Sequence, residues 1–509
     1  MVGDLLDRAA ARFPDRTAVV FGERRTTYRQ LAERVGRLAG GLRGLGLRPG
    51  DRLALFLDNC DQAWELILAC ARTGIVWVPL NYMLKGREVA AIVRHAGARA
   101  LAVGREHWPI VEPLLPELGL EAVVGVGDGA PGKPYQALIA ESQPDRPDAP
   151  PRPDDLFCLL YTSGTTGLPK GTRLSHRAIL AHARLARREY ALTPGAVGLV
   201  VLPYFVGATL NCVQIPGLGQ GITLVFNRKF SPAAFFELIR CERVTHVQTV
   251  PTMLVRLLES SEIDRADLSS IVTIGYGSAP MPVDRLRQLL DRFGPIFTQI
   301  YGLTETCAMA TVLRRHEHTL AGAAARRLAS CGRPAQGVEV RLVDEAGQEV
   351  GTDRPGEIVI RGPTLMDGYW NADEATAEAI RGGWFHSGDV ARRDADGFIY
   401  ISDRKKDMII TGGFNVYPKE VEEIVFTHPS VADCAVVGLP DPEWGEAVTA
   451  FVAPKAGAAL DPDEIVELCR RELAGYKKPR RVVLVDEIPR NPSGKALKRV
   501  LRDRYAVVR

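Results

Sequence analysis

Along the first 300 residues, the spacing of apolar residues switches repeatedly between a helical pattern and a strand pattern. Residues 28–45 carry apolar residues at helical spacing, so that Leu31, Val35 and Leu38 share one face. Residues 52–59 form a short, nearly continuous apolar run, which is typical of a strand buried on both faces. Repeated alternation of the two patterns predicts parallel sheets covered by helices. Further strands are predicted at 74–81, 100–104, 198–204, 245–250, 271–277 and 297–302 and at the start of 156–164, and helices at 4–13, 64–71, 86–96, 175–190, 231–242, 252–259 and 282–293.

Two other regions have a different pattern. Residues 127–155 are rich in Pro, Gly and Asp and are predicted to form a surface connection. From about residue 333, short strands follow one another without a long helix between them, which predicts a barrel-like β unit. These strands are predicted at 338–347, 356–362 and 397–407. A small α+β unit is predicted beyond them, with helices at 419–429 and 463–474 and strands at 431–441, 447–455 and 480–489.

The composition excludes several classes of protein. The chain has 509 residues, 46% of them hydrophobic, and a net charge of +3, so two to four globular domains are expected. A nucleic-acid binder would need a concentrated basic face, which a nearly neutral chain argues against. The nine cysteines lack CxxC spacing, which fits reduced thiols in the cytoplasm. We find no apolar stretch of membrane-spanning length and no secretory signal.

The strongest chemical signal lies between a predicted strand and a predicted helix, at residues 161–171. Hydroxyl residues alternate there with glycines, and Lys170 follows them. Glycine lets backbone N–H groups approach phosphate oxygens, and hydroxyls add further donors, so the loop is suited to polyphosphate. It is not a Walker A loop, because Pro169 stands where that motif requires glycine.

This loop resembles the signature of the adenylate-forming superfamily, which contains acyl- and aryl-CoA ligases, peptide-synthetase adenylation domains and beetle luciferases. Further motifs of that family match in order along most of the chain. They are Gly275-Tyr-Gly-Ser-Ala-Pro280, Tyr301-Gly-Leu-Thr-Glu-Thr306, Gly383-Trp-Phe-His-Ser-Gly-Asp389, Asp403-Arg-Lys-Lys-Asp407, Thr411-Gly-Gly-Phe-Asn-Val416 and Pro489-Arg-Asn-Pro-Ser-Gly-Lys495.

The resemblance sharpens the predicted fold class. It implies an α/β protein whose large N-terminal domain has two doubly wound β/α subdomains and a small β-barrel. A small, mobile α+β C-terminal domain is expected to follow. The implied boundaries are 1–403 for the N-terminal AMP-binding domain, 404–406 for the hinge, with Lys406 as its pivot, and 407–509 for the C-terminal domain.

The resemblance also implies a site for ATP and Mg²⁺. Both reactants of adenylation are anions, so the site must neutralise charge without a covalent nucleophile. Lys495 is expected to reach the carboxylate and the α-phosphate, Thr304 to donate to that phosphate, and Glu305 to bind Mg²⁺. The implied ATP- and AMP-binding residues are Thr162, Ser163, Gly164, Thr165, Thr166, Gly167, Lys170, Gly277, Ser278, Ala279, Pro280, Tyr301, Gly302, Asp389 and Arg404.

For the second half-reaction, rotation about the hinge would bring another segment to the site. The resemblance implies that CoA is the acceptor and that its pantetheine arm passes the two glycines, which leave room for a narrow tunnel. The implied CoA-binding residues are Gly412, Gly413, Trp444, Tyr476 and Lys477.

The acid-binding pocket is predicted to be apolar. Its implied residues are Tyr204, Phe205, Val206, Gln248, Gly275, Tyr276, Ile300, Cys307 and Met309. No carboxylate lies within 200–212, where amino-acid-activating relatives place an aspartate, so an α-amino acid is disfavoured. The segment 202–207 also lacks the histidine that many acyl-CoA ligases have there, and Tyr204 or Phe205 is expected to fill the space.

Three functional hypotheses follow. The first is ATP-dependent conversion of an apolar fatty or aryl acid to acyl-CoA. The second keeps adenylation but transfers the acyl group to a carrier-protein pantetheine or to an amine. The third is a regulatory or scaffold relative, which the retention of Lys495, Glu305 and Asp389 disfavours. A cytoplasmic enzyme is expected, and a homodimer is left open.

Overall fold

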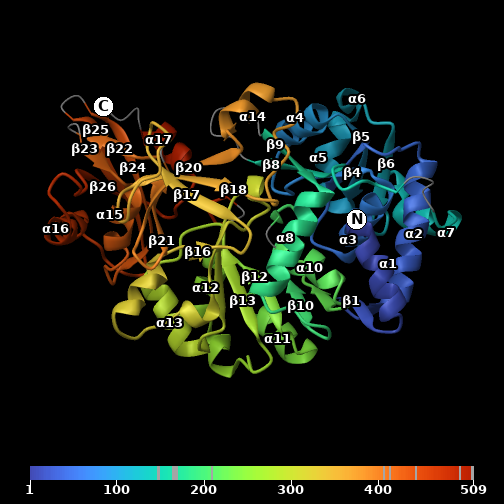
Figure 1. The fold of residues 1–509 in the computed structure, drawn as a ribbon, viewed down its shortest axis with the longest axis horizontal. Coiled ribbons are helices and arrows are strands. Elements are labelled where there is room, and N and C mark those ends of the chain that lie inside the picture. The colour runs from blue at the N-terminus through green and yellow to red at the C-terminus, as the bar shows by residue number, and fades with distance from the viewer. Residues whose placement is uncertain are drawn as a thin grey trace.

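Two large sheets, a smaller β unit and a C-terminal domain make up the molecule, whose N-terminal helices and C-terminal domain lie at opposite ends of its long axis (Figure 1). The structure is a computed structural model of the chain. It describes residues 1–145, 150–162, 170–207, 210–404, 407–411, 414–441, 444–491 and 494–505.

The first sheet has seven strands and is parallel except at one edge. Its order is β7 (Lys133–Pro134), β6 (Ala122–Val126), β5 (Ala98–Gly104), β3 (Arg52–Phe56), β4 (Val76–Pro79), β8 (Leu156–Thr162) and β9 (Lys170–Ser175). Only β8 and β9 pair antiparallel. The connecting helices include α3 (Asp61–Thr73), α4 (Gly86–Ala96), α5 (Trp108–Val111), α6 (Leu115–Leu118) and α7 (Tyr135–Glu141).

The second sheet has nine strands, in the order β16 (Arg333–Pro334), β15 (Thr311–Leu313), β14 (Phe297–Tyr301), β13 (Thr273–Gly277), β12 (His246–Thr249), β10 (Val197–Val200), β11 (Thr223–Phe226), β1 (Thr17–Phe21) and β2 (Arg24–Thr27). Its central strands are parallel, and the N-terminal hairpin β1–β2 completes one edge. The associated helices include α1 (Val2–Arg12), α2 (Tyr28–Gly44), α8 (His176–Glu189), α10 (Ile215–Leu218), α11 (Pro232–Glu242), α12 (Pro251–Leu258) and α13 (Val283–Phe293).

Local sequence explains where several of these helices begin and end. Thr27 caps α2 in a capping box with Gln30, which satisfies two otherwise unpaired backbone donors. Gly74 and Gly97 end α3 and α4 in the left-handed conformation, which glycine adopts without strain.

A five-stranded antiparallel unit follows and carries part of the predicted site. It contains β17 (Glu339–Val343), β18 (Gly356–Arg361), β19 (Ile380–Arg381), β20 (Trp384–Arg393) and β21 (Ile399–Arg404), with α14 (Asp373–Ala379) before β19. Antiparallel pairing of β20 with β21 places Asp389 opposite Arg404 along the backbone.

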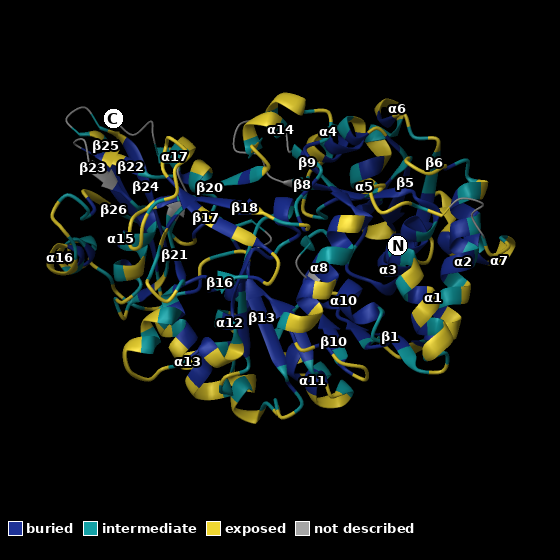
Figure 2. Ribbon diagram, in the orientation of Figure 1, coloured by how far each residue is buried: buried dark blue, intermediate teal, exposed yellow. Residues whose placement is uncertain are grey.

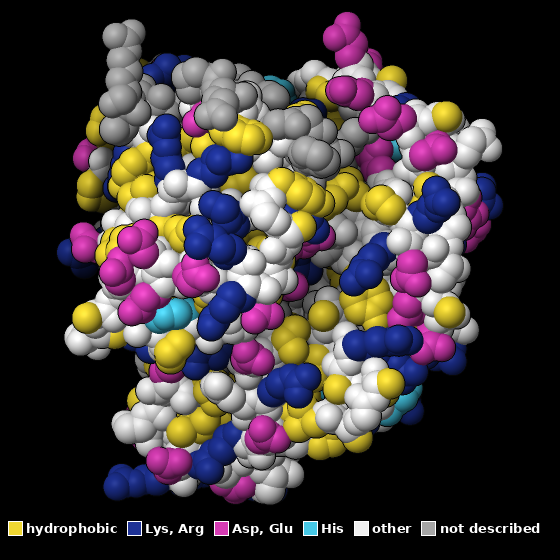
Figure 3. Space-filling view, turned by 90° about the vertical axis from the view of Figure 1, so that its left-hand side faces the viewer, with side chains coloured by type: hydrophobic (Ala, Val, Ile, Leu, Met, Phe, Trp, Pro, Cys, Tyr) yellow, Lys and Arg dark blue, Asp and Glu magenta, His cyan; other side chains and the backbone are white. Residues whose placement is uncertain are grey.

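The C-terminal domain is a second five-stranded sheet with helices. Its strands are β22 (Ile409–Thr411), β23 (Phe414–Val416), β24 (Val431–Asp441), β25 (Gly445–Pro454) and β26 (Arg481–Leu484), and its helices are α15 (Pro418–Val425), α16 (Pro462–Glu472) and α17 (Lys498–Tyr505). Figure 3 looks onto the end of the molecule that carries this domain, where basic and acidic side chains are interspersed.

The core lies along the strands. Figure 2 shows buried residues running through both large sheets, while exposed residues gather on the outer faces of the helices. Trp64, Trp77 and Phe157 are among the largest fully buried side chains and belong to one continuous core that both large sheets share. Among the helices that the structure describes, none has the length and apolarity needed to cross a bilayer.

The predicted fold class is confirmed, including the two doubly wound sheets, the small β unit and the α+β C-terminal domain. The surface connection predicted over 127–155 was wrong in part, because α7 lies within it. Leu138 and Ile139 of α7 are buried in the core that the two large sheets share. The predicted strand 198–204 was too long, since β10 ends at Val200. The hairpin β1–β2 and the helix α17 were not predicted.

The two glycines Gly332 and Gly337 provide a matched test of packing. Both have positive φ, but a side chain at Gly332 would overlap the backbone of Val312, whereas Gly337 has open space. Gly337→Ala is expected to cost about 1–2 kcal/mol through backbone strain alone. Gly332→Ala should cost about 1–3 kcal/mol more, because it adds overpacking. Urea unfolding measures both, and equal losses would contradict the packing shown here.

Candidate active site

The predicted site residues gather where strands of both large sheets end. The loops after β12, β13 and β14 leave the carboxyl edge of the second sheet, and the predicted phosphate loop joins β8 to β9 in the first. Crevices outside the carboxyl ends of parallel strands are where α/β sheets bind ligands.

Glu305 lies in a 3₁₀ turn after β14 and is buried. Its Oε1 accepts a hydrogen bond of 2.8 Å from the hydroxyl of Tyr369. Burial and the neighbouring carboxylate raise the pKa of Tyr369, so this hydroxyl remains a donor near neutral pH. Lys170 lies over the same ring, with Nζ 5.0 Å from its centroid. The structure therefore brings Lys170 and Glu305 together through Tyr369, which the sequence analysis missed.

Backbone pairing explains how Tyr369 reaches this position. Segment 367–370 lies along β9, where Trp370 N donates to Gly171 O at 2.8 Å and Arg173 N donates to Gly368 O at 3.0 Å. The segment comes from the region between β18 and α14, so it ties the small β unit to the edge of the first sheet.

Asp389 and Tyr301 form a second contact of the predicted nucleotide site. The Tyr301 hydroxyl donates to Asp389 Oδ2 at 2.7 Å, which joins the end of β14 to β20. The Ser387 hydroxyl accepts from Asp389 N and donates to Ile358 O, so it fixes the turn that presents the carboxylate. The side chain of Arg404 lies outside the described residues, although its backbone pairs with Asp389.

The turns after β13 and β14 have unusual backbone conformations. Ser278, Cys307 and Ala308 have φ of 69°, 54° and 85°, values that non-glycine residues rarely adopt. Gly277 packs against the backbone of Ile300, and a side chain at Gly302 would meet the backbone of Ala308 at 2.5 Å. Such strain is held only where the surrounding packing enforces it, and it clusters at functional sites. Thr304, Ala279 and Pro280 lie in the same two turns.

Of the predicted acid-pocket residues, Gln248 and Gly275 are neighbours in register on β12 and β13. Tyr276 is not brought together with them. It packs on the opposite side of β13, where its hydroxyl contacts Gln299 and His318, each at 3.0 Å. We therefore no longer count Tyr276 among the acid-binding residues. Ile300, Cys307 and Met309 are buried in the core that the two large sheets share.

The segment 202–207 packs onto the carboxyl edge of the first sheet. The Tyr204 hydroxyl donates to Leu55 O at 2.8 Å and accepts from Leu57 N at 3.1 Å. The neighbouring Phe205 contacts Tyr82 edge-on, with 5.1 Å between ring centroids, and Val206 is partly buried. Tyr204 thus takes a structural role in the segment whose missing histidine the resemblance pointed out.

The loop carrying Lys495 is docked against the N-terminal domain. A Cβ atom added at Gly494 would lie 2.8 Å from Oγ1 of Thr252, at the start of α12. Within the loop, Lys495 N donates to Asn491 Oδ1 and Asn491 N donates to Lys495 O, both at 2.8 Å. Elsewhere in the interface, Lys419 Nζ donates to Ile401 O at 2.8 Å.

The predicted CoA-binding residues lie in the C-terminal domain. The guanidinium of Arg480 stacks on Trp444, 3.6 Å from the ring centroid, a partner that the sequence analysis missed. Lys477 Nζ donates to Glu420 Oε2 at 2.5 Å and lies 5.8 Å from the ring centroid of Tyr476.

Several predicted residues lie outside the described residues. They are Ser163, Gly164, Thr165, Thr166, Gly167, Lys406, Gly412 and Gly413. For Thr162 only the backbone, at the end of β8, is described.

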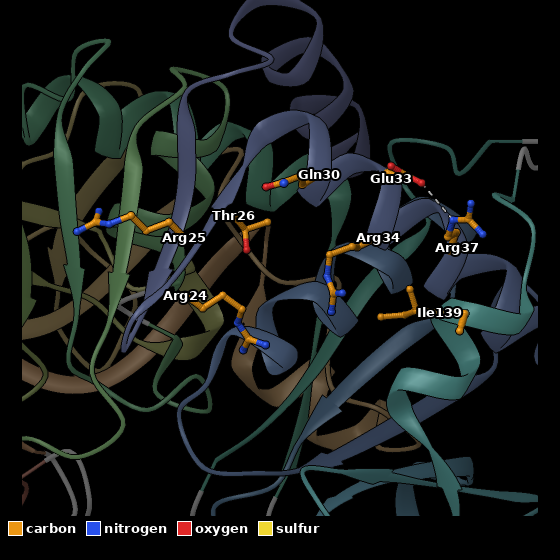
Figure 4. Close-up of a pocket in the computed structure, with 9 residues that line it drawn as sticks. Arg24, Arg25, Thr26, Gln30, Glu33, Arg34, Arg37 and Ile139 are labelled. Atoms are coloured by element: carbon orange, nitrogen blue, oxygen red, sulfur yellow. Dashed lines mark hydrogen bonds and ion pairs between the residues drawn. The ribbon is translucent and has the colours of Figure 1, made fainter.

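Two cavities lie apart from these residues. One of about 450 Å³ is lined by arginines of β2 and α2 (Figure 4), and several of these pair with buried or surface carboxylates. The other, about 190 Å³, lies beside Asp58, Glu106 and Arg228. Neither is lined by a predicted site residue.

Two family descriptions match most of the chain. The AMP-binding enzyme family matches residues 6–370, and the AMP-binding enzyme C-terminal domain matches residues 420–495. The chain belongs to the adenylate-forming enzymes. Within them it is of the acyl- and aryl-CoA ligase type, which activates carboxylic acids.

Similar proteins of this family cover the whole length of the enzyme. A feruloyl-CoA synthase of Amycolatopsis sp is 41% identical over 98% of each chain. A fatty acid–[acyl-carrier-protein] ligase, ScoC, of Streptomyces coeruleorubidus is 36% identical, covering 97% of this chain and 94% of that protein. The crystal structure of ATP-bound MatB from Rhodopseudomonas palustris superposes with a TM-score of 0.91 at 30% identity, covering 100% of both chains.

A substitution at Tyr204 can test whether its hydroxyl stabilises the fold or contacts the acid substrate. Tyr204→Phe leaves the buried N–H of Leu57 without its acceptor, which should cost about 1–3 kcal/mol of stability. If the hydroxyl acts only on the backbone, KM for the acid should change less than about twofold. Thermal unfolding and steady-state kinetics measure the two effects, and a large rise in KM without loss of stability would contradict this role.

Proposed function

We propose that this enzyme activates an apolar carboxylic acid, of the aryl class, with ATP and transfers the acyl group to the thiol of CoA. The observation that carries the proposal is the docking of the Lys495 loop against Thr252, which follows β12 at the carboxyl edge of the second sheet. The turn that holds Glu305 follows β14 at the same edge. The 41% identity with a feruloyl-CoA synthase along the whole chain supports both the aryl acid and CoA.

In the first half-reaction, a carboxylate oxygen attacks the α-phosphorus of ATP. The bond from that phosphorus to the bridging oxygen breaks, and pyrophosphate leaves. Lys495 neutralises the charge that builds between the two anions, and Thr304 donates to the α-phosphate. Lys170, which lies over Tyr369 beside Glu305, assists the departing phosphates.

Asp389 holds the ribose through its carboxylate, which Tyr301 orients. The loop 162–167 wraps the phosphates, and the turn from Gly277 to Pro280, with Gly302, borders the adenine. Arg404, opposite Asp389 on β21, contributes to the ribose site.

Glu305 suits Mg²⁺, because it offers a carboxylate oxygen of the kind this ion prefers. Its carboxylate would hold the ion, and Oε1 already accepts a hydrogen bond from Tyr369. When bound, Mg²⁺ would neutralise phosphate charge. The protein's own contribution is to hold the Glu305 carboxylate in one orientation through the Tyr369 hydroxyl.

In the second half-reaction, the thiolate sulfur of CoA attacks the acyl carbonyl carbon, and AMP leaves. Rotation of residues 407–509 about the hinge 404–406 withdraws Lys495 and brings Gly412 and Gly413 to the site. Trp444, backed by Arg480, offers one ring face to the adenine of CoA, and Tyr476 and Lys477 lie on the same domain.

The alternative acceptor is a carrier-protein pantetheine or an amine. The 36% identity with the fatty acid–[acyl-carrier-protein] ligase ScoC supports a carrier protein as the alternative acceptor. A carrier arm has the same terminal thiol as CoA but lacks its adenine, so Trp444 and Arg480 would have no partner.

The proposed function is tested by incubating the enzyme with ATP, Mg²⁺ and a panel of aryl and fatty acids, with CoA, a pantetheinylated carrier protein or an amine. We expect acid-dependent pyrophosphate release and acyl-CoA as the product by mass. Lys495→Ala should lower pyrophosphate release at least about 100-fold while ATP still binds. Acyl-AMP without acyl-CoA, or full activity in the variant, would contradict the proposal.

Gly494 provides a test of the docked state. Gly494→Ala would place a methyl against Thr252, whereas Gly457→Ala, also at positive φ in the C-terminal domain, meets open space. We expect Gly494→Ala to slow acid-dependent pyrophosphate release about tenfold or more, and Gly457→Ala to leave it within about twofold. Thioester formation from supplied acyl-AMP should be affected less. If the two variants behave alike, the docking contact has no part in adenylation.

A further inference from the structure

Tyr190 lies beside Gly275 although it comes from a distant part of the chain. It follows α8 directly, and its carbonyl accepts from His246 Nε2 at 2.9 Å and from Thr273 Oγ1 at 3.1 Å. These two bonds fix the backbone of Tyr190 to β12 and β13. Tyr190 was not predicted as a site residue, because it belongs to none of the family motifs.

The Tyr190 hydroxyl donates to Gln248 Oε1, directly over Gly275. A side chain at Gly275 would overlap both partners, and its first carbon would be 2.6 Å from Tyr190 Cε1. The thiol of Cys212 also lies beside the Tyr190 hydroxyl. Glycine at 275 is therefore what allows a tyrosine and a glutamine to meet at this face of the sheet.

The pair has unused hydrogen-bonding capacity in a place that solvent does not reach. Tyr190 and Gln248 are both fully buried. Gln248 Nε2 carries two hydrogens and donates to Thr249 O at 3.1 Å, which uses only one of them. The Tyr190 oxygen has two lone pairs, of which the Cys212 thiol can use one. One donor and one acceptor thus remain side by side.

The position of the pair suits the far end of an acid substrate. Gly275 and Gly277 face the same side of β13, and Ser278 begins the turn at the carboxyl edge, near the proposed adenylation centre. The step of three residues from Gly275 to Ser278 spans roughly 10 Å along the strand. A benzene ring with a short unsaturated acid side chain covers such a distance from its carboxyl carbon to its para substituent.

We propose that Tyr190 and Gln248 select an aromatic acid carrying a hydroxyl on the ring position farthest from the carboxylate. This inference rests on the proposed function and names its substrate class. The ring hydroxyl donates to the Tyr190 oxygen and accepts from the free hydrogen of Gln248 Nε2. A ring without the hydroxyl leaves both groups unpaired, and a long alkyl chain would place apolar carbon against them.

The test compares 4-hydroxycinnamic acid, cinnamic acid and hexadecanoic acid in acid-dependent pyrophosphate release. The wild-type enzyme should prefer 4-hydroxycinnamic to cinnamic acid by about 100-fold or more in kcat/KM, with little turnover of hexadecanoic acid. Tyr190→Phe should lower that preference about tenfold, chiefly through the hydroxylated acid, while cinnamic acid stays within about threefold. Gln248→Met, which keeps the volume without the amide, should lower the preference similarly.

Tyr28→Phe is the matched control, because it also removes a fully buried hydroxyl, one that donates to Ile222 O at 2.7 Å. It should leave the preference unchanged. Equal use of both cinnamic acids by the wild type, hexadecanoic acid as the best substrate, or a Tyr190→Phe variant that loses activity alike with both acids would overturn the inference. Each of those outcomes still shows acid-dependent pyrophosphate release, so they are distinct from failure of the proposed function, in which no acid releases pyrophosphate.

Discussion

The pairing of segment 367–370 with β9 is the contact on which the nucleotide side of the site depends. It is made by backbone atoms, so it does not rely on particular side chains at 171, 173 or 368. Through it the small β unit is held against the first sheet, and Tyr369 is brought to Glu305, which belongs to the second. The contact between Tyr369 and Glu305 thus depends on the positions of all three sheets. Displacement of any one of them would move the carboxylate proposed for the metal ion.

A second constraint lies in the turns after β13 and β14. Ser278, Cys307 and Ala308 adopt left-handed backbone conformations without being glycine, which costs free energy in each case. The surrounding core holds them there, as Gly277 against Ile300 and Gly302 against Ala308 illustrate. Rigid turns of this kind keep backbone N–H groups in fixed positions, which is what electrostatic stabilisation of a developing charge requires.

Much of the fold followed from the sequence because its signals are local. Strands such as 52–59 and helices such as 28–45 have clear periods, and the family motifs mark the turns that follow β13 and β14. Tyr369, Tyr190 and Arg480 were missed because their roles come from contacts between distant segments, which no local period encodes.

Strand alternation and local composition account for the residues that were placed incorrectly. Tyr276 stands between two glycines in a motif, but alternation along a strand turns it to the opposite side of the sheet. The helix α7 was hidden by the Pro- and Gly-rich residues around it, although its apolar residues Leu138 and Ile139 pack in the core.

The Gly494–Thr252 and Lys419–Ile401 contacts lie where the C-terminal domain meets the N-terminal domain. If the C-terminal domain rotates once in each turnover, as we propose, both contacts must break and re-form every cycle. Their combined strength then contributes to the barrier of the rotation step. It also sets how long the acyl-adenylate stays shielded from water before the thiol arrives. A tighter interface would protect the intermediate but delay its use, so the glycine at 494 balances hydrolytic loss against speed.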